Sequence, residues 1–341
     1  MKSLLRSAYS FSPTGRIVSP VCWWPEDAPE EKREWNGETV MFGGRGAPRA
    51  VVFDFGKEVG GYVRAEWGAA RGGPVALFFS EAFKYLSPFG DSVWALTDFI
   101  PGAGMHVYSG RGGERWRDPL LRGGFRYLLL RPLFPGNYEI EDIELELDFY
   151  VPEGGAYAGG FECSDPDLNR IWYAAAYTIQ AATKRPTESF MLGRDTAGHG
   201  EWVIMDGAKR DRSVWAMDLA VCLPSFLLTF GDAAVTRDSL GSLLDQKDVG
   251  VFALRKGYLP HAAFPPNRIT CHANAMNIFS NYVIWWIRGV HSQYLYAGDE
   301  KFAREVFGDI VEAFEWLETQ ARPSPQSGTP LFYADGMNDL S

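Results

Sequence analysis

The sequence is poor in cysteine and has no long apolar run. Its four cysteines, Cys22, Cys163, Cys222 and Cys271, lie far apart and form no CxxC pair, which excludes a disulfide-dense scaffold and a cysteine-based zinc site. We therefore expect buried free thiols. No stretch approaches the ~20 apolar residues of a membrane-spanning helix, and the amino terminus MKSLLRSAYSFS lacks the apolar core of a signal peptide. These absences predict a cytoplasmic protein without a membrane partner.

Basic residues are outnumbered by acidic ones. The chain has 33 Lys and Arg against 43 Asp and Glu, which gives a formal net charge of −10 at pH 7. An acidic chain repels phosphate backbones, so nucleic acid and anionic membranes are excluded as partners. The Gly-Gly pairs fall between apolar runs and none opens a helix with Lys-Ser/Thr, so no phosphate cradle is predicted. No metal triad is visible either, and we expect neither a cofactor nor a metal. A neutral sugar is compatible with this charge.

What the chain does have is a large apolar fraction in a β-like first half. Hydrophobic residues make up 46% and charged residues 22% of the 341 residues, as in globular proteins with room for two domains. Short runs of β-branched and aromatic residues, separated by Gly-rich turns, predict an antiparallel β-sandwich over residues 1–155. The expected strands are Ala50–Phe55, Gly61–Trp67, Pro74–Ser80, Met105–Ser109, Phe125–Arg131 and Tyr138–Tyr150.

Helical patterns replace the strands from residue 156 onward. Ser164, Pro166 and Asp167 have the spacing of a capping box and predict a helix that ends before Pro186. Two later segments echo each other, TFGDAAVTRDSLGSLL and YAGDEKFAREVFGDIV, each with a Gly that ends one helix and an Asp that caps the next. In the second copy, the apolar residues predict one stripe on one helix: Phe302, Val306, Ile310, Phe314 and Leu317.

Repeated αα-hairpins behind a β-sandwich favour a multidomain β + α protein with a partial (α/α)6 toroid over residues 156–341. Six hairpins close such a ring, and the helical part is about half as long as they require. We therefore expect a chain truncated within the ring. An open half-ring would expose an apolar face, which favours self-association or pairing with the missing barrel half.

The stretch DGAKRDRSVWAMD, from Asp206 to Asp218, combines three carboxylates, three basic groups and one Trp between two apolar segments. Carboxylates move protons, Arg binds hydroxyls and an indole stacks on a sugar ring, so this set is typical of a saccharide-binding hydrolase. The alternative is a solvated helix face with weak ion pairs. Spacings of five and seven residues between the acids do not fit one helical face and favour the site.

Four segments resemble the bacterial and fungal α-L-rhamnosidases of the six-hairpin glycosidase superfamily, and the resemblance spans nearly the whole chain. They are FRYLLLRP (125–132), GGFECSDPDLNRIW (159–172), the 206–218 stretch and GYLPHAAFP (257–265). The family inverts configuration while it hydrolyses terminal α-L-rhamnosyl groups. The resemblance thus implies a rhamnose-containing glycan or glycoside as substrate, with two carboxyl groups ~6.5–9.5 Å apart.

The same resemblance implies roles for the motif residues. Asp206 and Arg210 match positions that bind sugar hydroxyls, Trp215 matches a stacking Trp and Asp218 matches the closing Asp. Where well-known members have Arg-Asp-Glu-Arg with Glu as the proton donor, this sequence has Arg210-Asp211-Arg212, which leaves Asp211 as the candidate donor. In the family the general base comes from later hairpins, so this chain alone is expected to be inactive or nearly so.

Several further residues are candidates for the rim of the pocket. Trp202 precedes the motif and His272 lies in a loop after Phe264, and both are predicted to bind substrate. His261 is a weaker candidate for sugar hydroxyls, because a lone histidine usually has an ordinary structural role. Two other functions stay open at this stage, a non-catalytic sugar-binding module and a six-hairpin glycosidase that acts on another sugar.

Overall fold

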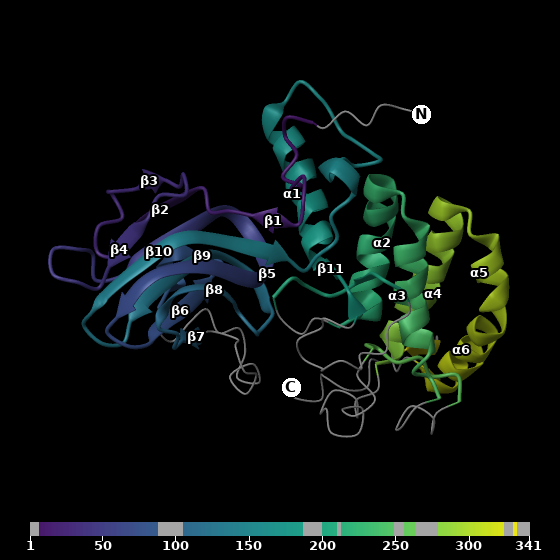
Figure 1. Cartoon of the computed structure of the whole chain (residues 1–341). Helices are drawn as coiled ribbons and strands as arrows, with labels where there is room; N and C mark the ends of the chain where they lie inside the picture. Colours follow the sequence, from purple (N-terminus) through teal and green to yellow (C-terminus); the bar gives the residue numbers. More distant parts are fainter. Residues whose placement is uncertain are drawn as a thin grey trace. The chain divides into compact units, whose positions relative to one another are not determined.

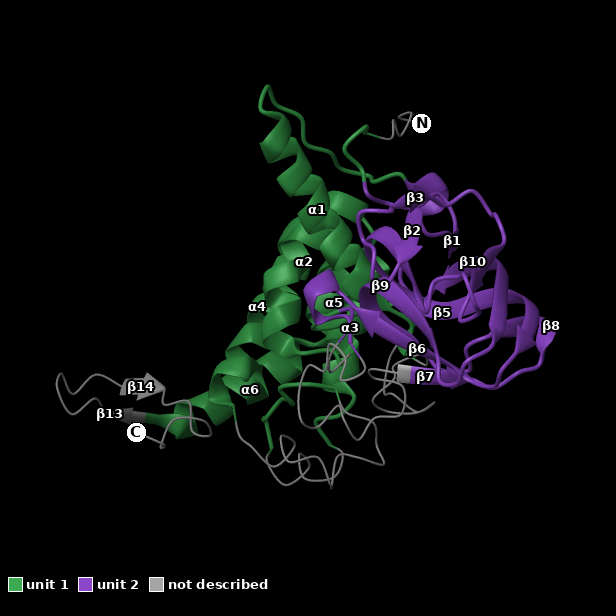
Figure 2. Cartoon of the chain, turned by 90° about the vertical axis from the view of Figure 1, so that its left-hand side faces the viewer, with its two compact units in different colours: residues 1–10, 156–207, 211–341 green, residues 11–155, 208–210 purple. Residues whose placement is uncertain are grey.

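The computed structural model describes residues 7–87, 105–186, 200–209, 213–248, 256–263, 279–323 and 330–332. The chain divides into two compact units (Figure 2). The helical unit comprises residues 1–10, 156–207 and 211–341, and the β unit comprises residues 11–155 and 208–210.

The β unit is a ten-stranded antiparallel sheet folded into two layers around one long strand, β5 (Figure 1). The first part of β5 pairs with β2 and β9, whereas its second part pairs with β8 and β10. The strand order is β1-β10-β5-β9-β6-β7, and β3 pairs with β2 while β4 pairs with β10. The strands are β1 Ile17–Val18, β2 Cys22–Pro25, β3 Arg33–Glu34, β4 Val40–Phe42, β5 Val51–Arg71, β6 Val75–Ser80, β7 Met105–Tyr108, β8 Gly112–Arg117, β9 Arg122–Pro132 and β10 Asn137–Leu147.

Aromatic packing joins the two layers. Trp67, on the second part of β5, stacks on Tyr108 of β7 with ring centroids 4.1 Å apart. Both rings are buried, and offset aromatic pairs stabilise a core beyond their buried area. The predicted β-sandwich is thus confirmed. One detail was wrong, since the two strands expected at 50–55 and 61–67 are parts of the single strand β5, whose pairing with β9 is irregular between Asp54 and Gly61.

The helical unit holds six helices and two pairs of short strands within its described residues. The helices are α1 Pro166–Ala182, α2 Ala216–Phe230, α3 Ala233–Leu244, α4 Ser280–Ala297, α5 Glu300–Glu305 and α6 Phe307–Gln320. Strand β11 (Thr183–Lys184) pairs with β12 (Val203–Ile204), and β13 (Ala321–Pro323) pairs with β14 (Pro330–Phe332). A helical domain after the β-sandwich, as predicted, is confirmed.

The two Gly-Asp turns form as the sequence predicts. Gly231 and Gly298 adopt left-handed φ angles of 69° and 66° and end α2 and α4. Asp232 caps α3 by accepting a hydrogen bond from the Ala234 amide, and Asp299 caps α5 by accepting one from the Phe302 amide. Each turn therefore reverses the chain between two helices, as in an αα-hairpin.

Two local predictions were wrong. The cap of α1 is Asp165, not Ser164, because the Asp165 side chain accepts hydrogen bonds from the two following free amides. The expected single stripe is interrupted at Val306, where the helix breaks into α5 and α6 and the apolar face rotates. Within that stripe, Phe302 and Leu317 are buried, whereas Phe314 is 53% exposed.

Candidate functional site

The motif that starts at Asp206 begins at a short hairpin in the helical unit. Strand β12 is tied to α3, because the Ile204 amide donates a hydrogen bond to Ser239 Oγ at 2.9 Å. Asp206 follows β12 after Met205. Its amide donates to the Ser213 carbonyl at 3.0 Å, and its Oδ1 accepts from the Ser213 amide at 3.1 Å. Two hydrogen bonds therefore join Asp206 to Ser213 within the motif.

The proposed proton donor Asp211, the sugar-binding candidate Arg210 and the predicted substrate residue His272 all lie outside the described residues. Lys209, which precedes them, belongs to the β unit and forms an ion pair with Glu81 at 3.1 Å.

Trp215 lies at the start of α2, in extended conformation. A segment from later in the chain holds it in place. The Ala216 amide donates to the His261 carbonyl at 2.9 Å, and the Ala263 amide donates to the Val214 carbonyl at 2.8 Å. This two-bond bridge places the GYLPHAAFP segment beside the motif, so two of the segments that carry the family resemblance meet at Trp215.

Four rings form an aromatic cluster around this bridge: Trp215, His261, Phe279 and Tyr282. Trp215 lies 5.5 Å from the His261 ring and 6.0 Å from the Tyr282 ring, which it meets edge to face. Phe279 lies 4.6 Å from His261 and 5.5 Å from Tyr282. The cluster thus joins the first turn of α4 to the start of α2.

His261 is the buried centre of this cluster. Its ring is fully buried, and its Nδ1 lies 3.1 Å from the hydroxyl of Tyr258, which is also buried. A histidine enclosed in this way holds its neighbours in place. Its surroundings favour a structural role over the direct contact with sugar hydroxyls that the sequence left open.

The charges of Asp206 and Asp218 both affect the pKa of the Tyr282 hydroxyl. Burial raises the pKa of the Tyr282 hydroxyl, and the charges of Asp218 and Asp206 raise it further. Asp218, in the first turn of α2, also contributes with burial to the raised pKa of Cys222, about 11. The motif carboxylates Asp206 and Asp218 therefore share one environment with Trp215. Each of these side chains and Tyr282 is partly exposed, as a ligand-contacting group must be.

Trp202, the remaining predicted substrate residue, lies beside Arg185. The Arg185 guanidinium is 4.9 Å from the Trp202 ring and also forms an ion pair with Glu201 at 3.1 Å. Among the described residues, no group of three or more His, Cys, Asp or Glu side chains could hold a metal ion. In the same part of the chain, no helix is both long and apolar enough to cross a bilayer.

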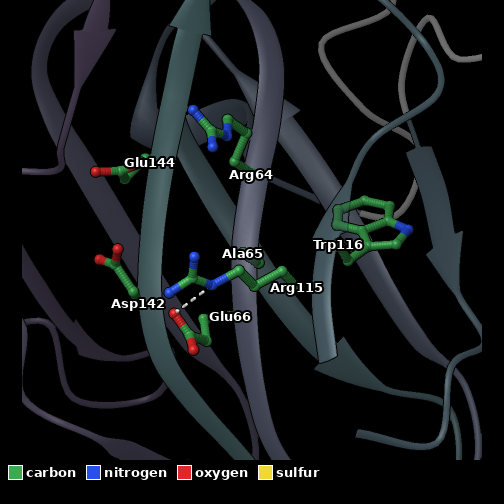
Figure 3. Close-up of a pocket in the computed structure, with 7 residues that line it drawn as sticks. All are labelled: Arg64, Ala65, Glu66, Arg115, Trp116, Asp142 and Glu144. Carbon is green, nitrogen blue, oxygen red and sulfur yellow. Dashed lines mark hydrogen bonds and ion pairs between the residues drawn. The ribbon is translucent and has the colours of Figure 1, made fainter. Parts of the chain in front are cut away.

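A separate groove of about 250 Å³ lies on the β unit, over β5, β8 and β10 (Figure 3). Arg115 and Glu66 pair across it at 3.2 Å, and Arg64, Asp142 and Glu144 line it as well. Alternating charges on neighbouring strands are typical of the wet face of a sandwich, where exposed ion pairs contribute little. We assign no function to this groove.

Sequence reasoning did not identify Tyr282 as a site residue. It lies far from the motif in sequence, in a helix whose other aromatic residues signal packing. Only the folded arrangement of α2 and α4 brings it to Trp215. Gly289 lets α4 pack closely on α3, because a Cβ there would lie 2.8 Å from a side-chain carbon of Leu240, whereas it would meet Ala220 of α2 at an ordinary contact distance of 4.0 Å.

Comparison with known proteins places the chain among α-L-rhamnosidase folds. Residues 45–145 match the family model of the bacterial alpha-L-rhamnosidase concanavalin-like domain. A rhamnosidase from Klebsiella oxytoca with rhamnose bound is similar over 91% of this chain and 57% of its own, at 19% identity and a TM-score of 0.64. A search among curated protein sequences found no match.

Two longer structures are similar over nearly the whole chain. The α-L-rhamnosidase from Dictyoglumus thermophilum matches 92% of this chain with a TM-score of 0.59 and 17% identity. The match covers 30% of that protein's own length. The Streptomyces avermitilis α-L-rhamnosidase complexed with L-rhamnose matches 96% of this chain with a TM-score of 0.59 and 17% identity. The match covers 26% of that protein's own length. At these identities the likeness shows the fold. The chain spans between about a quarter and just over half of these relatives.

Proposed function

We propose that this rhamnosidase-like chain is part of an inverting glycoside hydrolase that releases terminal α-L-rhamnosyl groups from glycans or glycosides. One observation carries the proposal: Tyr282, which meets Trp215 edge to face, feels the charges of both Asp218 and Asp206, in a fold similar to that of rhamnosidases. Two of those relatives were solved with rhamnose bound. Carboxylates accept hydrogen bonds from sugar hydroxyls, and an indole covers the apolar face of a sugar ring.

In the proposed reaction, Asp211 donates its proton to the glycosidic oxygen while the bond from that oxygen to the anomeric carbon breaks. A second carboxylate takes a proton from water, whose oxygen attacks the anomeric carbon from the opposite face. Asp206 and Asp218 bind and orient the sugar, with Arg210 and Trp215. We assign the second carboxylate to helical hairpins beyond this chain, so that the chain by itself binds sugar without turning it over.

A non-catalytic sugar-binding protein is the second candidate. The observation that favours it is the Arg210-Asp211-Arg212 sequence, which has no Glu where the best-known rhamnosidases have their proton donor. Neighbouring positive charge favours the charged form of a carboxyl group, whereas a proton donor must be held in its neutral form. The residues that bind sugar would be the same in both candidates.

Binding of L-rhamnose to this chain, measured by isothermal titration calorimetry, tests the sugar site. Asp206→Asn and Asp218→Asn should each weaken binding roughly 10- to 100-fold, because a charge-assisted hydrogen bond is replaced by a neutral one. Asp167→Asn is the matched control, since Asp167 lies in the first turn of α1 as Asp218 lies in that of α2. Absence of binding by the unaltered chain, or equal affinity in all variants, would refute the proposal.

Hydrolysis of p-nitrophenyl α-L-rhamnoside by a longer polypeptide containing this chain separates the two candidates. The hydrolase predicts turnover that Asp211→Asn abolishes, whereas the binding protein predicts none. Faster hydrolysis of an aryl α-L-fucoside or β-glucuronide would assign the enzyme to another sugar.

An apolar stripe on α6 supports the expected pairing with further structure. Phe307, Val311 and Phe314 are spaced four and three residues apart and are 63%, 41% and 53% exposed. A stripe of this kind on one helix is typical of an interface. We propose that further hairpins of the same ring cover it, and that without them the chain self-associates. A monomer at micromolar concentrations in analytical ultracentrifugation would contradict this.

A further inference from the structure

We propose that Tyr282, the edge-to-face neighbour of Trp215, is a substrate-contacting residue of the saccharide site, whose hydroxyl donates a hydrogen bond to a sugar oxygen. This inference rests on the proposed function and extends it to a residue from a different helix. The family resemblance, carried by the segments described above, assigns no role to this position.

The ring of Tyr282 is fixed before any ligand binds. Its position in the first turn of α4 is set by a hydrogen bond from its amide to the Phe279 carbonyl at 2.9 Å. Three neighbouring rings then enclose it, namely Trp215, Phe279 and His261, at 6.0, 5.5 and 6.0 Å. A side chain held in this way loses little conformational entropy when a ligand binds.

Tyr258 and Tyr282 differ in whether their hydroxyl groups are available to a ligand. Tyr258 is buried, and its hydroxyl lies within hydrogen-bond distance of His261 Nδ1 and accepts from the Phe279 amide at 3.4 Å. Tyr282 is only partly buried, and within the described part of the chain no side chain or carbonyl accepts a hydrogen bond from its hydroxyl. The Tyr282 hydroxyl therefore has a free donor next to the sugar-binding carboxylates.

The charges around Tyr282 suit a sugar hydroxyl. Burial, then Asp218, then Asp206 raise the pKa of the phenol, which keeps it protonated and able to donate. The two carboxylates accept hydrogen bonds, whereas the phenol donates. A sugar carries hydroxyls that do both, so this mixed set fits a neutral polyol better than it fits an anion, which the carboxylates would repel.

The test is the affinity of the chain for L-rhamnose after Tyr282→Phe, which removes the hydroxyl and keeps the ring. We expect roughly three- to tenfold weaker binding, the effect of one neutral hydrogen bond. Tyr294→Phe is the matched control, because Tyr294 is a half-exposed tyrosine on the same helix, and its affinity should be unchanged. Near-ultraviolet circular dichroism of each variant verifies that the aromatic cluster is intact.

The outcomes distinguish this inference from the proposed function. If the unaltered chain binds and Asp206→Asn binds weakly, but Tyr282→Phe binds as well as the unaltered chain, only the role of Tyr282 is refuted. If the unaltered chain binds no L-rhamnose, both are refuted. Should Tyr282→Phe not fold, hydroxyl-radical footprinting of the unaltered chain decides: protection of Tyr282 by L-rhamnose supports the contact, and equal oxidation with and without sugar refutes it.

Discussion

Removal of the Asp299 side chain should destabilise the helical unit more than the loss of an ordinary helix cap. Asp299 Oδ1 accepts a hydrogen bond from the Phe302 amide at 3.2 Å, and its Oδ2 accepts one from Gln293 Nε2 at 3.1 Å. Gln293 is fully buried on α4. Loss of the cap costs about 1 kcal/mol, and one unpaired N–H of a buried amide costs about 1–2 kcal/mol more. The ion pair with the half-exposed Arg237 adds little.

We therefore expect Asp299→Ala to lower the free energy of unfolding by about 2–3 kcal/mol. Asp165→Ala is the matched control, since this exposed cap of α1 accepts only amides of its own first turn and should cost about 1 kcal/mol. Urea unfolding followed by circular dichroism at 222 nm reports the helical unit of both variants. An equal loss of stability in the two variants would refute the role of Gln293.

Three further predictions concern the two units. Asp206→Ala should lower the free energy of unfolding by about 1–2 kcal/mol, because the buried Ser213 amide loses its acceptor, whereas Asp206→Asn should retain it; thermal unfolding distinguishes the two. Burial and the hydrogen bond to Glu114 raise the pKa of Tyr108 from 10.0 to about 12. Since the fold favours the protonated phenol, this stability is complete below pH 10 and is lost as the pH rises to 12; alkaline unfolding of Tyr108→Phe should lack this loss. The thiol of Cys222, with a pKa of about 11, should react with Ellman's reagent at pH 8 far more slowly than that of Cys163, and equal rates would contradict the prediction.

Local features of the fold were predictable because their causes are local. A left-handed Gly followed by a capping Asp is a short-range signal, and both copies, at Gly231 and Gly298, form as expected. The strand patterns were likewise readable from alternation and Gly-rich turns. Where two caps compete, as Ser164 and Asp165 do, sequence spacing alone does not decide which side chain reaches the free amides.

The features of the fold and the site that the sequence did not predict depend on contacts between segments far apart in the chain. The motif could be recognised in the sequence, but its link to Tyr282 arises only when α4 packs against α2 and Tyr282 meets Trp215 edge to face. The break at Val306 has no sequence signal either, because the apolar pattern continues through this residue while its backbone leaves the helical conformation. The position of His261 at the centre of the aromatic cluster also had no signature in its neighbouring residues.

The 21-residue strand β5 has a consequence for the mechanics of the β unit. In a sandwich whose sheets are joined only by loops, each sheet can loosen by itself. Here a single stretch of backbone is hydrogen-bonded into both layers, so shear applied to one is transmitted directly to the other. A protease that cut the irregular step near Val59 would remove this backbone link between the layers, while each half of β5 stayed paired with the strands of its own layer.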